Sequence, residues 1–129
     1  MSYTFSRIVN TDFATAVANV TEELKKEGFG ILTEIDIAAT LKKKLDVDFR
    51  AYKILGACNP PFAYQALMAE EEIGTMLPCN VIVQETKDGK VKVSAVDPIA
   101  SMAAVKNSAL EKIAGEVANK LQTVIKNLA

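Results

Sequence analysis

The sequence predicts an α+β fold: a mostly antiparallel sheet of about five strands with two long helices on one face and short connecting helices. Amphipathic helical patterns near the two ends of the chain, at residues 13–27 and 108–128, supply the long helices. Short segments rich in β-branched residues supply the strands, and Asp88-Gly89 predicts a tight hairpin between the last two. Because each long helix has one apolar stripe to bury, both suit the same face of the sheet.

The first two elements are a strand and a long helix. Residues 3–9 place Tyr3 and Phe5 on one face of a strand. Asn10-Thr11-Asp12 then offers side chains that can cap a helix. Gly28 stands where a helix commonly ends in a left-handed residue.

A second strand and a short helix follow. Residues 31–37 alternate as a strand, and Asp36 is expected to cap a helix that buries Ile37, Leu41 and Leu45. Lys42-Lys43-Lys44 falls on the exposed side of this helix. This run is interpreted as a solvated face, with an anion-binding edge that includes Arg50 and Lys53 as the alternative.

The third strand, residues 49–57, leads into Cys58-Asn59-Pro60. Asn59 is expected to accept hydrogen bonds from the first-turn amides of a short helix, because Pro60 suits the first helical position. That helix carries Phe62 inward.

The remaining elements are two strands and a long helix. The strands are expected at residues 79–85 and 91–96, and residues 99–105 predict one or two helical turns. Ser108 and Glu111 have the spacing of a capping box and predict the start of the last helix.

Composition indicates one cytoplasmic domain over residues 1–129. Half of the residues are hydrophobic, which is enough for an ordinary core. The 15 basic and 16 acidic side chains nearly cancel, so we expect neither nucleic acid nor an anionic membrane as a partner. No apolar run approaches the roughly 20 residues of a membrane span, and the start of the chain does not resemble a signal peptide. The lack of histidine excludes Ser-His-Asp and Cys-His catalysis and the usual zinc ligand sets.

Two Cys-Asn pairs, Cys58-Asn59 and Cys79-Asn80, form the candidate site. They contain both cysteines of the chain, and each pair lies at the end of a predicted strand. One interpretation is structural, because free cysteine packs as a small buried hydrophobe and asparagine organises turns.

The interpretation that we favour is a ligand pocket. The asparagine amides would orient a small ligand, and the start of the helix after Asn59 would favour an anion or a polar group. Tyr52 and Lys53 contribute from the third strand. Apolar walls are expected from Phe62, Met76, Leu77 and Met102.

The alternative is thiol-dependent redox chemistry or soft-metal handling. Cys58 at a helix N-terminus would be the attacking thiol and Cys79 its resolving partner. The same two thiols with Met76 or Met102 would suit Cu(I). The spacing is not Cys-x-x-Cys and no imidazole activates a thiol, so no cofactor and no reaction are assigned.

Several segments together resemble the DUF302 family, a domain of unknown function found in small bacterial and archaeal proteins. They are residues 28–36, 52–61 and 73–81, and Asp97-Pro98 followed by Met102. The resemblance implies a TBP-like order of strand, helix, four strands and helix, assembly into homodimers, and Asp97 at the site. It implies no activity. Where relatives are expected to have histidine, this chain has Tyr64.

Overall fold

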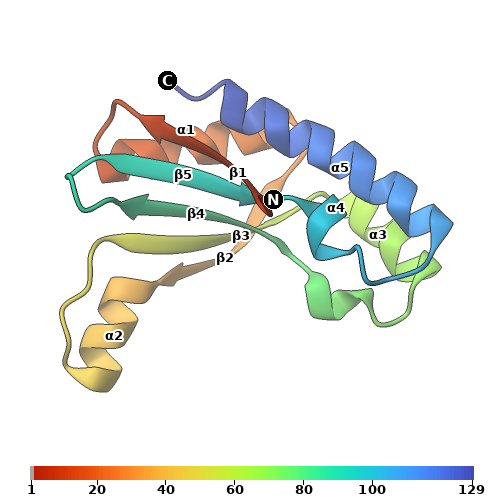
Figure 1. Cartoon of the computed structure of the whole chain (residues 1–129), viewed down its shortest axis with the longest axis horizontal. Coiled ribbons are helices and arrows are strands. Elements are labelled where there is room, and N and C mark those ends of the chain that lie inside the picture. Colours follow the sequence, from red (N-terminus) through yellow and green to blue (C-terminus); the bar gives the residue numbers. More distant parts are fainter. Residues whose placement is uncertain (1) are drawn as a thin grey trace.

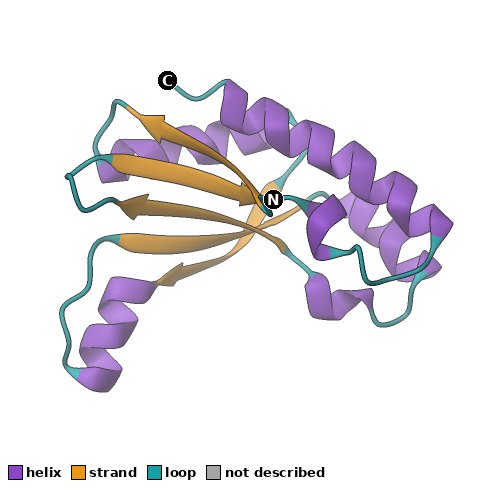
Figure 2. Cartoon of the chain, in the orientation of Figure 1, coloured by secondary structure: helices purple, strands orange, loops and turns teal. Residues whose placement is uncertain are grey.

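A five-stranded antiparallel sheet with helices packed on one face forms the fold (Figures 1 and 2). The computed structural model describes residues 2–129. The strand order across the sheet is β1-β5-β4-β3-β2. The strands are β1 (Thr4–Val9), β2 (Gly30–Asp36), β3 (Tyr52–Cys58), β4 (Cys79–Glu85) and β5 (Val91–Val96). The predicted α+β class and the mostly antiparallel sheet are confirmed.

Two long helices and three shorter ones connect and cover the strands of the described chain. No helix within residues 2–129 is both long enough and apolar enough to cross a bilayer. The helices are α1 (Phe13–Lys26), α2 (Ile37–Leu45), α3 (Pro60–Ala69), α4 (Pro98–Ser101) and α5 (Ser108–Lys126), and a 3₁₀ turn, η1 (Ile73–Met76), precedes β4.

The core lies between the sheet and the helices α1 and α5. The register sets Val81 opposite Ala95 and Val83 opposite Val93, so these side chains share the face that the helices cover. Buried side chains of α1 and α5 meet them there: Ala16, Val20, Leu24, Val117, Leu121 and Val124.

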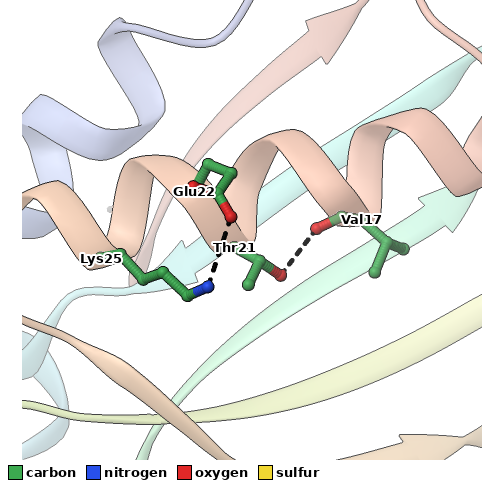
Figure 3. Close-up of polar contacts among 4 residues, drawn as sticks. All are labelled: Val17, Thr21, Glu22 and Lys25. Atoms are coloured by element: carbon green, nitrogen blue, oxygen red, sulfur yellow. Dashed lines mark hydrogen bonds and ion pairs between the residues drawn. The ribbon is translucent and has the colours of Figure 1, made fainter.

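Polar contacts on α1 remain within the helix (Figure 3). Thr21 Oγ1 donates to the carbonyl oxygen of Val17 at 2.8 Å. Lys25 Nζ lies 3.3 Å from Glu22 Oε1, and both of these side chains are largely exposed. An exposed pair of this kind adds little stability. The apolar stripe is therefore what docks α1 on the sheet.

The helices α1 and α5 do not cover the opposite face of the sheet, which is called the open face below. Ile54 of β3 stands opposite Ile82 of β4 and Ile35 of β2, so an apolar row crosses three strands. Ile8 and Ile35 are exposed, and Ile54 and Ile82 are only half-buried.

The short helix α2 differs from the prediction. Asp36 caps it as expected, because Asp36 Oδ1 accepts from Ala39 N at 2.9 Å. The expected buried stripe is wrong: no residue of α2 is buried, and Leu45 is 66 % exposed. The reason is its position, since α2 follows directly on β2 and projects from that edge of the sheet, away from α1 and α5 (Figure 1).

Asn107, rather than Ser108, caps α5. Its Oδ1 accepts from Ala109 N at 3.1 Å and from Leu110 N at 3.3 Å. Ser108 is therefore the first residue of the helix and not its cap, and the expected capping box of Ser108 with Glu111 is replaced by the cap at Asn107.

The hairpin between β4 and β5 also differs in detail. Gly89 has a φ of +75°, whereas Asp88 does not take a positive φ. The loop closes through Thr86, whose carbonyl oxygen accepts from Gly89 N at 3.0 Å and whose N–H donates to Lys90 O at 2.7 Å. The turn is therefore longer than the two-residue type that would need positive φ at both positions.

Gly56 is the position on β3 where a side chain cannot fit. A Cβ there would collide with Thr33 Oγ1 and lie 2.8 Å from Pro78 Cγ. We expect Gly56→Ala to lower the free energy of unfolding by about 1–3 kcal/mol through overpacking, as measured by urea denaturation. Gly30→Ala on β2 is the matched control, because its Cβ would meet nothing within 4 Å. Equal losses in the two variants would contradict this account.

Candidate functional site

A cavity of about 270 Å³ lies where β3 ends and β4 begins. The end of the sheet forms one wall with Ala57, Cys58 and Cys79. The helices α3 and α5, which lie side by side in Figure 1, form two further walls, to which they contribute Phe62 and Ala114 respectively.

The pairing of β3 with β4 brings the two cysteines to this cavity. Ala57 stands opposite Cys79 in the antiparallel register, so the last residues of β3 meet the first residue of β4. Both cysteines line the cavity, Cys79 buried and Cys58 half-buried, and both are free. The structure therefore brings the cysteines of the two Cys-Asn pairs to one cavity.

The asparagines of the two pairs are not gathered with them. Asn59 lies on the cavity wall and is only 8 % exposed. Asn80 is exposed on the open face of the sheet, because neighbouring residues of a strand point to opposite faces. Tyr52 lies with Asn80 along that open face. The expected pair of amides around one ligand is therefore wrong.

Asn59 already uses its amide for a structural contact. Its Nδ2 donates to the carbonyl oxygen of Glu27 at 3.0 Å and so ties the start of α3 to the end of α1. The expected capping bonds from Asn59 to the first-turn amides are not formed. Pro60 and Pro61 occupy the first helical positions and have no N–H to offer. The start of α3 is therefore poorly equipped for the anion that the sequence suggested.

Three further candidates lie outside the cavity lining. Lys53 Nζ pairs with Glu34 Oε1 at 2.8 Å, and this hydrogen bond raises the pKa of Lys53. Asp97 Oδ1 accepts from Ile99 N at 3.0 Å and caps α4. Met76 is partly exposed in η1. Lys53 and Asp97 therefore make local structural contacts, and Met76 is exposed to solvent, so none of the three faces the cavity as expected.

Phe62, Leu77 and Met102 line the cavity as expected, but the sequence did not reveal its deeper walls. Ala66 of α3 and Ala114 of α5 are buried and leave space where larger side chains would meet. The only sign of these walls in the sequence is that small residues occur on the buried stripes of the helices. Which residues they face depends on how the helices pack. Phe29 and Val117 were missed for the same reason.

The described lining contains no acidic or basic side chain. Burial raises the pKa of Cys79 to about 11, and the nearby Cys58 adds to this rise. Cys79 therefore remains a neutral thiol near pH 7. Within residues 2–129, no three His, Cys, Asp or Glu side chains gather as a metal-binding group. The cavity suits uncharged, apolar chemistry.

Comparisons with known proteins identify the family and the fold. The family model for the domain of unknown function DUF302 matches residues 5–128, so the resemblance seen in the sequence is confirmed. The crystal structure of an uncharacterized conserved DUF302 protein from Bacillus stearothermophilus matches with a TM-score of 0.93 and 26% identity, over 100% of each chain. No curated protein matches the chain.

The two cysteines should differ in reactivity. We expect iodoacetamide at pH 8 to modify Cys58 before Cys79, because Cys79 is buried and protonated. Peptide mass spectrometry of quenched time points measures both rates. Faster modification of Cys79 in the folded protein would contradict the described burial.

The raised pKa of Cys79 also predicts a dependence of stability on pH. Its folded-state pKa lies at about 11, above the ordinary 9.0, so folding favours the neutral thiol. The resulting stability is fully present below about pH 9 and is lost as pH rises towards 11. Urea denaturation across this range should show the loss in wild type and in Cys58→Ala, and a smaller loss in Cys79→Ala. An identical loss in Cys79→Ala would exclude Cys79 as its source.

Proposed function

The chain belongs to the DUF302 family, whose name assigns no activity, and from that premise we propose that it binds a small molecule in the cavity beside Cys58 and Cys79. The supporting observation is the cavity itself, which has apolar walls and a volume of about 270 Å³, close to the lower end of ordinary ligand pockets. An unfilled apolar cavity lowers the stability of a folded protein. A protein that needed this region only for packing would gain by filling it.

The rim of the cavity supports entry of a ligand from solvent. Leu32 and Leu67 line it and are 66 % and 47 % exposed, so they mark its open side. Phe62 and Cys58 also line the cavity and are half-buried, and Met102 and Cys79 are buried. A molecule could therefore enter between Leu32 and Leu67 without separation of α5 from the sheet.

A thiol-dependent redox or Cu(I)-handling function is the second candidate. It is favoured by three sulfur-bearing side chains on one cavity, Cys58, Cys79 and Met102, which are soft ligands. Met76, the other methionine considered from the sequence, is not among them. The raised pKa of Cys79 weighs against this candidate, because thiolates are the metal ligands and nucleophiles.

A second copy of the chain is the partner that we propose for the open face of the sheet. Ile35, Ile54 and Ile82 form an apolar row there, and a twofold arrangement would bury the row of one copy on that of the other. The nearly balanced charge of the chain supports an apolar partner surface over nucleic acid.

The ligand proposal predicts a co-purified molecule. Native mass spectrometry of freshly purified protein should show an organic adduct, and Ala66→Leu should lose it because the added methyl groups occupy the cavity. Ala109→Leu, an exposed position on α5, is the matched control and should keep the adduct. A bound ligand at one hundred times its Kd should stabilise the wild type by about 2.7 kcal/mol.

A folded Ala66→Leu variant that keeps the organic adduct would place the molecule elsewhere and contradict the proposal. A copper adduct that is lost in both Cys58→Ala and Cys79→Ala would favour the second candidate.

Sedimentation tests the proposed dimer. At micromolar concentration we expect a particle of about twice the 13.9 kDa chain mass. Ile54→Lys should shift it to the monomer, because a charge in the apolar row would lose its hydration on association. Ile99→Lys, an exposed position on α4, should leave the dimer intact. A wild-type particle near the chain mass would contradict the proposal.

A further inference from the structure

We propose that the cavity takes a neutral aromatic molecule of one or two rings. This inference rests on the small-molecule function proposed above and names the class of ligand. It follows from the size of the cavity, the side chains of its walls and their lack of charge.

The size sets the upper limit on what can be enclosed. The cavity measures about 270 Å³. Apolar cavities of about 150 Å³ remain dry and take up benzene. A single ring therefore fits with space to spare, and two fused rings approach the available volume.

The walls favour an aromatic ring over an alkyl chain. Three of the lining side chains contain sulfur: Cys58 and Cys79 at the end of the sheet, and Met102 after α4. Divalent sulfur makes favourable contacts with the edge of an aromatic ring. Phe29 and Phe62 add two ring surfaces, which favour offset or edge-to-face contact with another ring. An alkyl chain would gain burial of its apolar surface from the same walls but not these contacts with an aromatic ring.

The electrostatics of the walls select a neutral ligand. The described lining offers no basic group to a carboxylate or phosphate and no acidic group to an amine. The one side-chain amide, Asn59, is uncharged, and one of its two Nδ2 hydrogens already bonds to the carbonyl oxygen of Glu27. An ionised ligand would therefore lose its hydration with no charged partner to replace it. Any polar substituent is expected to face the opening between Leu32 and Leu67.

Three probes separate these features in calorimetric titrations: indole, a neutral pair of fused rings; 1-octanol, a neutral alkyl chain; and indole-3-acetate, a charged aromatic. We expect indole to bind at least tenfold more tightly than either of the others. Met102→Leu keeps the side-chain volume and removes the sulfur. It should weaken indole binding by about two- to tenfold and leave 1-octanol binding nearly unchanged. Met68→Leu, an exposed position on α3, is the matched control and should change neither.

The outcomes distinguish the ligand class from the proposed function. If 1-octanol binds as tightly as indole, and Ala66→Leu abolishes the binding of both, the aromatic class is overturned while the small-molecule function stands. Tighter binding of indole-3-acetate than of indole would overturn the selection for a neutral ligand. If no probe binds to folded protein, the aromatic inference fails, and a native spectrum without any adduct would then overturn the proposed function as well.

Discussion

The register between β3 and β4 decides which side chains this cavity contains. With Ala57 opposite Cys79, the two strands present their small apolar residues to the helix layer and bring Cys58 to the same end of the sheet. A shift of one residue would exchange the faces of β4, so that Asn80 would enter the cavity and Cys79 would leave it. The register also places Val81 and Val83 in the core, and so a shift would expose the valines that hold the sheet to α1 and α5.

The helix α3 remains over the cavity because an asparagine holds each of its ends. Asn59 Nδ2 donates to Glu27 O at 3.0 Å, and Asn107 Nδ2 donates to Ala69 O at 2.8 Å. Gly28 has a φ of +87° and leaves room for Asn59, since a Cβ there would lie 3.2 Å from Asn59 Nδ2. These contacts hold both ends of α3 in place, and the small side chain of Ala66 leaves the cavity next to this helix unfilled.

The parts of this arrangement that depend on local pattern could be predicted from the sequence. The apolar stripe of α1, the cap at Asp36 and the alternation of β4 each need only neighbouring residues, and the structure contains all three. The position of Asn80 could have been predicted from the same alternation of β4. Alternation turns Cys79 and Asn80 to opposite faces of the sheet, whereas the ligand hypothesis placed both residues in one pocket.

Features that depend on how the helices pack on the sheet and on one another could not be predicted from the sequence. Leu45 of α2 has the spacing of a buried residue, yet the helix projects beyond the surfaces that could cover it. Asn59 has the position of a helix cap, but the carbonyl of Glu27 competes for its side chain. Ala66 and Ala114 become cavity walls only because α3 and α5 pack with these small residues at the same place.

The most direct test compares Asn59→Ala with Asn80→Ala by urea denaturation. The account predicts that Asn59→Ala lowers the free energy of unfolding by about 1–3 kcal/mol, because the partly buried carbonyl of Glu27 loses its donor. Asn80→Ala, on the open face, should change it by no more than about 0.5 kcal/mol. Equal losses in the two variants, or the larger loss in Asn80→Ala, would contradict the assignment of the two asparagines to opposite faces.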